Sequence, residues 1–170
     1  KAAESVAERW TPLVLRELLC GSRRFNDLHR GVPLMSRTLL AGRLEQLEDA
    51  GIVRSVARPG GRGRDYQLTA AGEELRALIE CLGEWGQRWV RTQVGPGDLD
   101  PGLLMWDIHR RVNLEALPSE RVVVRFDFRG VPATVRCPRT WWLVLERREV
   151  DLCLNDPRFS VYIVVSAHLR

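Results

Sequence analysis

Several features that enzymes and membrane proteins carry are missing from this sequence. No apolar run approaches 18 residues and no signal-peptide pattern is present, so we expect neither a transmembrane helix nor a membrane partner. The GxSxG and HExxH motifs are absent, and the glycine-rich stretch at residues 60–63 lacks the strand-to-helix context of a nucleotide loop. These absences predict a cytoplasmic protein that is not an enzyme.

Cysteine is scarce, and its spacing suits neither zinc nor a CxxC redox motif. We expect buried, reduced thiols at the four positions Cys20, Cys81, Cys137 and Cys153. Cys20 is the candidate for a redox sensor, because Arg23 and Arg24 are close to it in sequence. His109 and His168 have no cysteine or acidic partners at ligand spacing, so we predict no metal, and we expect no cofactor.

Positive charge is concentrated in one part of the chain. The 170 residues carry 26 basic and 22 acidic side chains, a net charge of +4, and 45% of them are hydrophobic, which is ample for a buried core. Residues 9–64 hold 11 arginines against 5 acidic residues, whereas residues 96–170 hold 11 against 10. An uneven basic excess of this kind is the electrostatic footprint of a nucleic-acid-binding segment.

That basic segment contains a short helix followed by a predicted hairpin, from Ser36 to Tyr66. Ser36 is a good N-cap, and Gly51 suits the C-terminal cap of the same helix. One apolar face of this helix is formed by Leu39, Leu40, Leu44 and Leu47. Strands are expected at 52–56 and 66–69, joined by the tip at 58–64, which has three arginines, three glycines and no apolar residue.

Such a helix and tip predict a surface that binds duplex DNA. Arginine can pair bidentately with guanine and a threonine methyl can touch thymine, so we expect base contacts from the helix. The tip arginines and the turn before the second helix would contact phosphate. The predicted DNA-binding residues are Arg23, Arg24, Ser36, Arg37, Thr38, Arg43, Arg58, Arg62 and Arg64. The alternative is an ordinary solvated helix and loop.

Two helices are expected upstream, at residues 4–20, with a fresh start near Pro12, and at 25–29. Three helices and a hairpin are the order of a winged helix-turn-helix. The sequence resembles the HxlR-type winged-helix regulators through Arg9-Trp10, residues 15–18 (LREL), 24–28 (RFNDL), 44–47 (LEQL) and 66–72 (YQLTAAG). This resemblance implies a dimeric, MarR-like bacterial regulator. Many relatives carry a redox-sensing cysteine before the first helix, where this chain has none.

A long helix is predicted from Ala70 to Val94. Apolar residues step along it by three and four, which is the spacing of helices that pack side by side. We expect a homodimer interface at Leu75, Leu78, Leu82, Trp85 and Trp89. The alternative is packing within the chain on a second domain.

Helix breakers at 95–102 indicate a linker between a domain at 1–94 and a second domain at 103–170. The second domain is expected to have one helix, at 103–112, and an antiparallel sheet with one apolar face, from runs at 122–129, 141–145, 150–154 and 159–165. The fold class is therefore α+β. This half is similar to a sterol-carrier-protein-like domain, incomplete here because the helices that would close an apolar cavity do not follow.

An apolar small-molecule effector is the further partner that this similarity implies. Four aromatic residues could line its pocket or simply pack in the core: Trp106, Phe126, Phe128 and Trp141. The leading hypothesis is a ligand-responsive transcriptional regulator that binds a pseudo-palindromic operator as a homodimer. The alternative is a lipid or metabolite carrier whose winged helix does not bind DNA; it requires acidic residues to neutralise the face of Arg37, Arg43 and Arg62.

Overall fold

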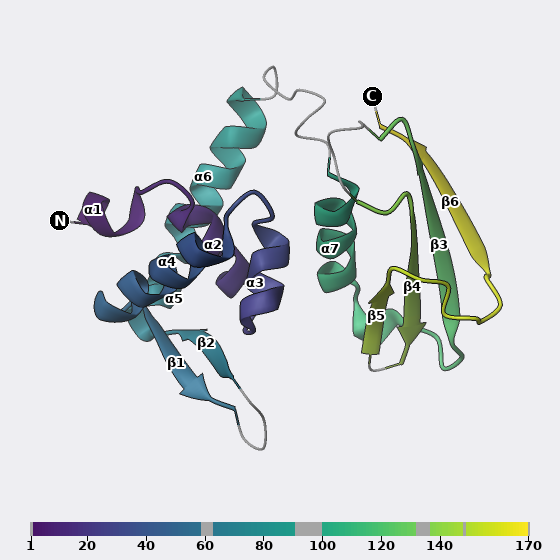
Figure 1. Cartoon of the computed structure of the whole chain (residues 1–170), viewed down its shortest axis with the longest axis horizontal. Coiled ribbons are helices and arrows are strands. Elements are labelled where there is room, and N and C mark those ends of the chain that lie inside the picture. Colours follow the sequence, from purple (N-terminus) through teal and green to yellow (C-terminus); the bar gives the residue numbers. More distant parts are fainter. Residues whose placement is uncertain (1, 59–62, 91–99, 132–136, 148, 170) are drawn as a thin grey trace. The chain divides into compact units, whose positions relative to one another are not determined.

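The computed structural model describes residues 2–58, 63–90, 100–131, 137–147 and 149–169. The chain divides into two compact units, Lys1–Thr92 and Gln93–Arg170 (Figure 1). Among the described residues, every helix is too short or too polar to cross a lipid bilayer.

The first unit is a set of helices from which a two-stranded hairpin projects (Figure 1). Its helices are α1 (Ala2–Val6), α2 (Thr11–Leu19), α3 (Phe25–Gly31), α4 (Arg37–Asp49), α5 (Ala70–Glu74) and α6 (Arg76–Trp89). The break after α1 lies where Trp10 has a φ of 78°, and the next helix begins at Thr11 with Pro12 in its first turn, which agrees with the fresh start predicted near Pro12. The hairpin pairs β1 (Val53–Ala57) with β2 (Arg64–Leu68).

The core of this unit gathers the apolar faces of α2, α3 and α4. Its fully buried side chains include Leu15, Leu18, Leu28, Leu40 and Leu44. Leu39, which the sequence places on the apolar face of α4, is instead exposed.

In its described part, the predicted helix from Ala70 to Val94 is two helices, because the chain turns at Leu75 between α5 and α6. Residues 91–94 of the prediction lie outside the described residues. Leu75 packs against the core, and Ile79 on α6 is buried in it. Gly72 on α5 lies so close to the Ile52 carbonyl that a Cβ there would be 2.3 Å from its oxygen. These contacts fix α5 against the base of the hairpin.

The second unit is a helix packed on a four-stranded sheet. Helix α7 (Pro101–Arg111) and the short η3 (Leu114–Ala116) precede β3 (Val122–Arg129), β4 (Thr140–Glu146), β5 (Glu149–Cys153) and β6 (Ile163–His168). Their order in the sheet is β5-β4-β3-β6, with α7 packed against β5 (Figure 1). Helix and sheet together make the chain an α+β protein.

The prediction of a purely antiparallel sheet is wrong, because β6 pairs with β3 in parallel. Residues 154–162, between β5 and β6, form a crossover connection. Nine extended residues reach about 30 Å, enough to return along a strand and reach the far edge. Alternating apolar residues identify strands but carry no information on their direction.

Two further expectations for the second unit are corrected. The linker ends earlier than predicted, because Pro101 and Gly102 form the first turn of α7, capped by the Asp100 carboxylate through the Gly102 amide at 2.7 Å. The sheet also lacks a single apolar face: the neighbours Val123 and Val124 are both buried, although they point to opposite sides.

Candidate nucleic-acid interface

Helix α4 presents its first turn to solvent. The Ser36 hydroxyl accepts a hydrogen bond from the Leu39 amide at 3.2 Å, which confirms the predicted N-cap. Leu40, Leu44 and Leu47 are buried, so the opposite side of the helix faces outward. Arg37 and Thr38, the two predicted base-contacting residues of that turn, are both exposed.

Arg37 is held by two residues at the start of α3. Its Nη2 donates to the Asn26 side-chain oxygen at 2.8 Å. Its guanidinium carbon lies 5.0 Å from the centroid of the Phe25 ring, within cation–π range. The sequence analysis assigned no role to Asn26 or Phe25. The available clue was that an aromatic residue and an amide residue begin the helix that precedes the one starting at Arg37.

Arg43 is a correction to the predicted set. Its guanidinium forms an ion pair with Glu8, and only 10% of its side chain is exposed. The residue therefore joins α4 to the segment between α1 and α2 instead of presenting its charge to solvent. Helical spacing placed Arg43 outside the leucine face but could not show that an earlier segment covers it.

Arg23 and Arg24 are exposed and lie in the turn before α3. Their backbone is attached to the hairpin, because the Tyr66 amide donates to the Arg23 carbonyl at 2.8 Å and Arg24 forms a β-bridge with Asp65. The turn and the hairpin are therefore connected. The arginines predicted to contact phosphate come from these two segments.

The hairpin, which we call the wing, carries arginines in different states. Arg58 pairs with Asp65 at 3.1 Å, with about a third of its side chain exposed. Arg64 is exposed at the start of β2. Arg62 lies outside the described residues. Of the wing arginines predicted to bind DNA, the two that the structure describes are therefore unequal: Arg64 presents its charge openly, and Arg58 shares its charge with a carboxylate.

A pair of hydrogen bonds ties the end of α4 to the wing. The Glu48 carboxylate accepts from the Ser55 hydroxyl at 2.6 Å and from the Ser55 amide at 3.1 Å. These two bonds, with a smaller contribution from the Arg64 charge, lower the pKa of Glu48 below its ordinary value. Sequence reasoning missed this link, since no local pattern connects residues on a helix and a strand.

Four of the five predicted dimerisation residues form an exposed stripe on α6. Leu78, Leu82, Trp85 and Trp89 are 48–68% exposed in the single chain. Leu75 is the exception, since it packs against the core of its own chain. The single chain therefore leaves two leucines and two tryptophans uncovered along one side of α6.

The predicted ligand-binding aromatics are packed in the second unit. Phe128 and Trp141 form a buried cluster with Met105, and Phe126 packs against it. Trp106 is buried and stacks on His109, with ring centroids 5.2 Å apart. The structure thus places all four in packed positions of the core.

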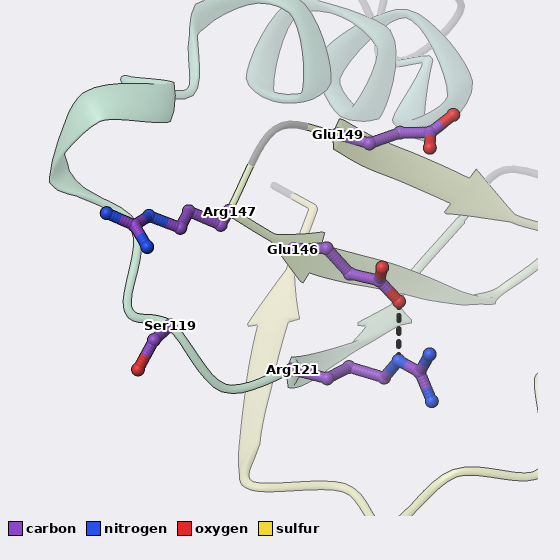
Figure 2. A pocket seen from close by; sticks show the side chains of 5 residues that line it. All are labelled: Ser119, Arg121, Glu146, Arg147 and Glu149. Carbon is purple, nitrogen blue, oxygen red and sulfur yellow. Dashed lines mark hydrogen bonds and ion pairs between the residues drawn. The ribbon is translucent and has the colours of Figure 1, made fainter.

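Two surface pockets are described in this unit, and neither is lined by those aromatics. One, of about 570 Å³, is lined by the charged residues Arg121, Glu146, Arg147 and Glu149 together with Ser119 (Figure 2). Arg121 and Glu146 pair across it at 2.5 Å. The other, of about 430 Å³, lies along α7 between Leu104 and Val112. The charged lining of the first pocket does not match an apolar effector.

The cysteines are all free, but the expectation that they are buried is wrong. Cys20 and Cys81 are exposed, and Cys137 and Cys153 are partly exposed. Partial burial raises the pKa of Cys137 and Cys153, with Asp100 and Asp151 adding to the effect, so these two thiols are disfavoured as thiolates. Among the described residues, no three potential ligands gather as a metal site would require.

Comparisons with known proteins match the first unit. The family model for the HxlR-like helix-turn-helix matches residues 5–94. An HTH-type transcriptional regulator of Mycobacterium tuberculosis, Rv3095, is 40% identical over 99 residues, which are 56% of this chain and 61% of that protein. The chain thus spans about three fifths of this relative's length.

Two further similarities extend over most of the other protein. The HTH-type transcriptional regulator YvaP of Bacillus subtilis is 32% identical over 91 residues, 53% of this chain and 84% of that protein. The crystal structure of an HTH-type transcriptional regulator, ytcD, superposes with a TM-score of 0.50 at 23% identity, covering 53% of this chain and 93% of that one. The superposition supports the fold of the first unit.

Proposed function

Because the chain belongs to the HxlR-like helix-turn-helix family, whose model matches residues 5–94, we propose that it is a transcriptional regulator that binds duplex DNA. The relatives described above are named as transcriptional regulators, and the family is not one of enzymes. The observation that carries the proposal is the exposed first turn of α4, where Arg37 and Thr38 stand free of the core. Arginine and threonine at the start of a groove-binding helix read base edges.

In this proposal, affinity comes from arginines around that helix. Arg64 on the wing and Arg23 and Arg24 before α3 contact phosphate and displace counterions, as does Arg62. Ser36 caps α4 and its exposed position also suits a phosphate contact. Arg58, already paired with Asp65, contributes less. Arg43 is left out, since Glu8 neutralises it.

A homodimer completes the proposal. The exposed apolar stripe on α6, Leu78, Leu82, Trp85 and Trp89, is the surface on which a second copy would pack. Two copies would present two α4 helices to the two halves of a pseudo-palindromic operator. The protein would act in the cytoplasm, where its DNA lies.

The second unit is proposed to resemble part of a sterol-carrier-protein-like domain and to bind an effector. A ligand there would act through different affinities for two arrangements of the dimer. Of the two pockets, the one in Figure 2 has a charged lining, whereas the one along α7 is lined in part by Leu104, Ile108 and Val112 and is the better match for the apolar molecule expected from the sequence.

The alternative, a carrier whose winged helix does not bind DNA, requires acidic residues to neutralise the arginine face. Glu8 does this for Arg43. Arg37, in contrast, is held by the neutral Asn26 amide and the Phe25 ring, so its positive charge is kept. The observation at Arg37 favours DNA binding.

Duplex binding measured as a function of salt tests the proposal. The full chain should shift a duplex carrying the promoter beside its own gene, and log affinity should fall linearly with log salt concentration. The triple change Arg58→Ala, Arg62→Ala and Arg64→Ala should weaken binding and flatten that slope. Unchanged affinity and slope would remove the wing from the mechanism, and no binding to any duplex would overturn the proposed function.

A further inference from the structure

The side chain of Arg37 is already ordered in the free protein by residues of a different helix. Asn26 holds its Nη2 at 2.8 Å, and the Phe25 ring lies 5.0 Å from the guanidinium carbon. Both partners belong to the first turn of α3, whereas Arg37 begins α4. The contact therefore joins the starts of two helices through one exposed side chain.

Each contact restricts a different freedom of this side chain. The ring of Phe25, which is itself packed against the core, limits how far the guanidinium can swing from α3. The hydrogen bond to Asn26 limits rotation about the last bonds of the side chain. A free arginine would lose this freedom only on binding, at a cost in affinity for its target.

The contacts leave the reading surface of Arg37 available. A guanidinium has five N–H donors, and Asn26 uses one of the two on Nη2. Whichever of these two is used, one complete edge with a pair of parallel donors remains for the O6 and N7 acceptors of guanine. The amide of Asn26 is neutral, so the positive charge also remains.

A comparison with Arg43 on the same helix shows why the partner matters. Glu8 neutralises Arg43 and covers it, so that 10% of its side chain is exposed. Arg37 has an uncharged partner and stays exposed. Asn26 therefore orients the guanidinium of Arg37 and leaves free the pair of N–H donors that would bind guanine. Glu8 does not leave Arg43 free in this way.

We propose that Asn26 is a positioning residue for base recognition, which directs Arg37 toward a guanine in the major groove without contacting the base itself. This inference rests on the proposed DNA-binding function. It predicts that changing Asn26 alters which sequence is preferred, whereas the phosphate contacts that supply most of the affinity stay as they are.

The test is a measurement of base discrimination with the full chain. A pool of random duplexes is first selected with the unchanged protein, and the guanine read by Arg37 is identified as the position where Arg37→Ala loses preference. Affinities are then measured by fluorescence anisotropy for the selected duplex and for one altered at that guanine. Asn26→Ala should lower the ratio of these affinities by about three- to tenfold, with an unchanged salt slope.

Two variants separate positioning from a structural role. Asn26→Gln keeps a neutral amide oxygen that can accept from Arg37, so it should retain more of the discrimination ratio than Asn26→Ala does. Gln67→Ala removes the same kind of bond elsewhere in the unit, the one that Arg54 donates to Gln67 at 2.9 Å, and should leave the ratio unchanged.

The possible outcomes separate the positioning role of Asn26 from the proposed DNA-binding function. An Asn26→Ala protein that keeps the full ratio, or that loses affinity for both duplexes equally together with thermal stability, would overturn the positioning role while DNA binding stands. Failure of the unchanged protein to select any duplex would overturn the proposed function, and this inference with it.

Discussion

Glu8 and Arg43 form an ion pair that joins the segment after α1 to helix α4. The arginine is nearly buried, and its Nε has no hydrogen-bond partner, so Glu8 is the principal compensation for its buried charge. This pair makes Arg43 a structural residue of α4.

We therefore expect Arg43→Ala to change stability and to leave DNA binding largely unchanged. The variant should lose about 1 kcal/mol in the free energy of unfolding, because Glu8 is half-exposed and its pairing is partly screened by solvent. Urea denaturation measures this loss. Glu8→Gln should lose a comparable free energy of unfolding, and the double variant should lose less than the sum of the two single losses. If Arg43→Ala instead flattens the salt dependence of DNA binding, Arg43 contacts DNA.

The close approach of Gly31 to Glu17 gives a second prediction. A Cβ on Gly31 would lie 2.0 Å from the Glu17 carboxyl carbon, and Glu17 is fully buried. Gly31→Ala should therefore displace a carboxylate that Arg16 holds at 2.7 Å, at a cost of about 2–4 kcal/mol.

Gly42 is the matched control for Gly31, since it lies within α4 and a Cβ there meets no atom within 4 Å. Gly42→Ala should stabilise the protein by about 0.5–1 kcal/mol, because alanine favours a helix interior. Thermal unfolding of both variants by circular dichroism gives the comparison. Equal melting temperatures for the two would show that the Glu17 carboxylate moves aside freely.

The bonds between Glu48 and Ser55 predict a pH-dependent stability. Because the folded-state pKa of Glu48 is lowered, its contribution is present above the unfolded pKa and is lost as the pH falls through the folded pKa. Ser55→Ala should therefore lower the melting temperature at neutral pH. The difference from the unchanged protein should shrink once the pH falls below the ordinary glutamate value of about 4.3.

Ser55→Thr keeps the hydroxyl and serves as the control, so it should follow the unchanged protein across the pH range. If the melting-temperature difference between Ser55→Ala and the unchanged protein stays constant from neutral to acidic pH, the substitution acts through the strand and not through the bonds to Glu48.

Much of the first unit could be predicted from the sequence because its signals are local. The leucines of α4, the Ser36 cap and the glycine after Ala50 lie within a few turns of one another, and the helix begins and ends where they indicate. Arg43, Asn26 and Ser55 could not be assigned in this way, because their partners belong to other elements. The same limit applies to β6, whose direction depends on a crossover and not on its own residues.

The exposed stripe on α6 predicts a dimer that one charge should disrupt. Leu82→Glu would place a carboxylate among Leu78, Trp85 and their counterparts in the second copy, where its desolvation is costly. Sedimentation velocity across a concentration series should show the unchanged chain as a dimer and the variant as a monomer.

Gln87→Glu adds the same charge on the opposite side of α6, where Gln87 is exposed, and should leave the assembly intact. A monomeric unchanged protein would show that the stripe meets some other surface, and a dimeric Leu82→Glu variant would place the dimer interface elsewhere.

The wing arginines should contribute unequally to DNA binding, because one of them is already paired. Arg64 is exposed and releases counterions on meeting a phosphate, so Arg64→Ala should reduce the slope of log affinity against log salt by about 1. Arg58 must first break its 3.1 Å ion pair with Asp65 before it can contact a phosphate, so Arg58→Ala should change the slope by less. Asp65→Asn frees Arg58 and should raise affinity at low salt.

Two results would contradict this account of the wing. Equal salt slopes for Arg58→Ala and Arg64→Ala would mean that the Arg58–Asp65 pair opens fully on DNA. An Asp65→Asn protein that binds DNA with no higher affinity than the unchanged protein would show that Arg58 does not reach phosphate.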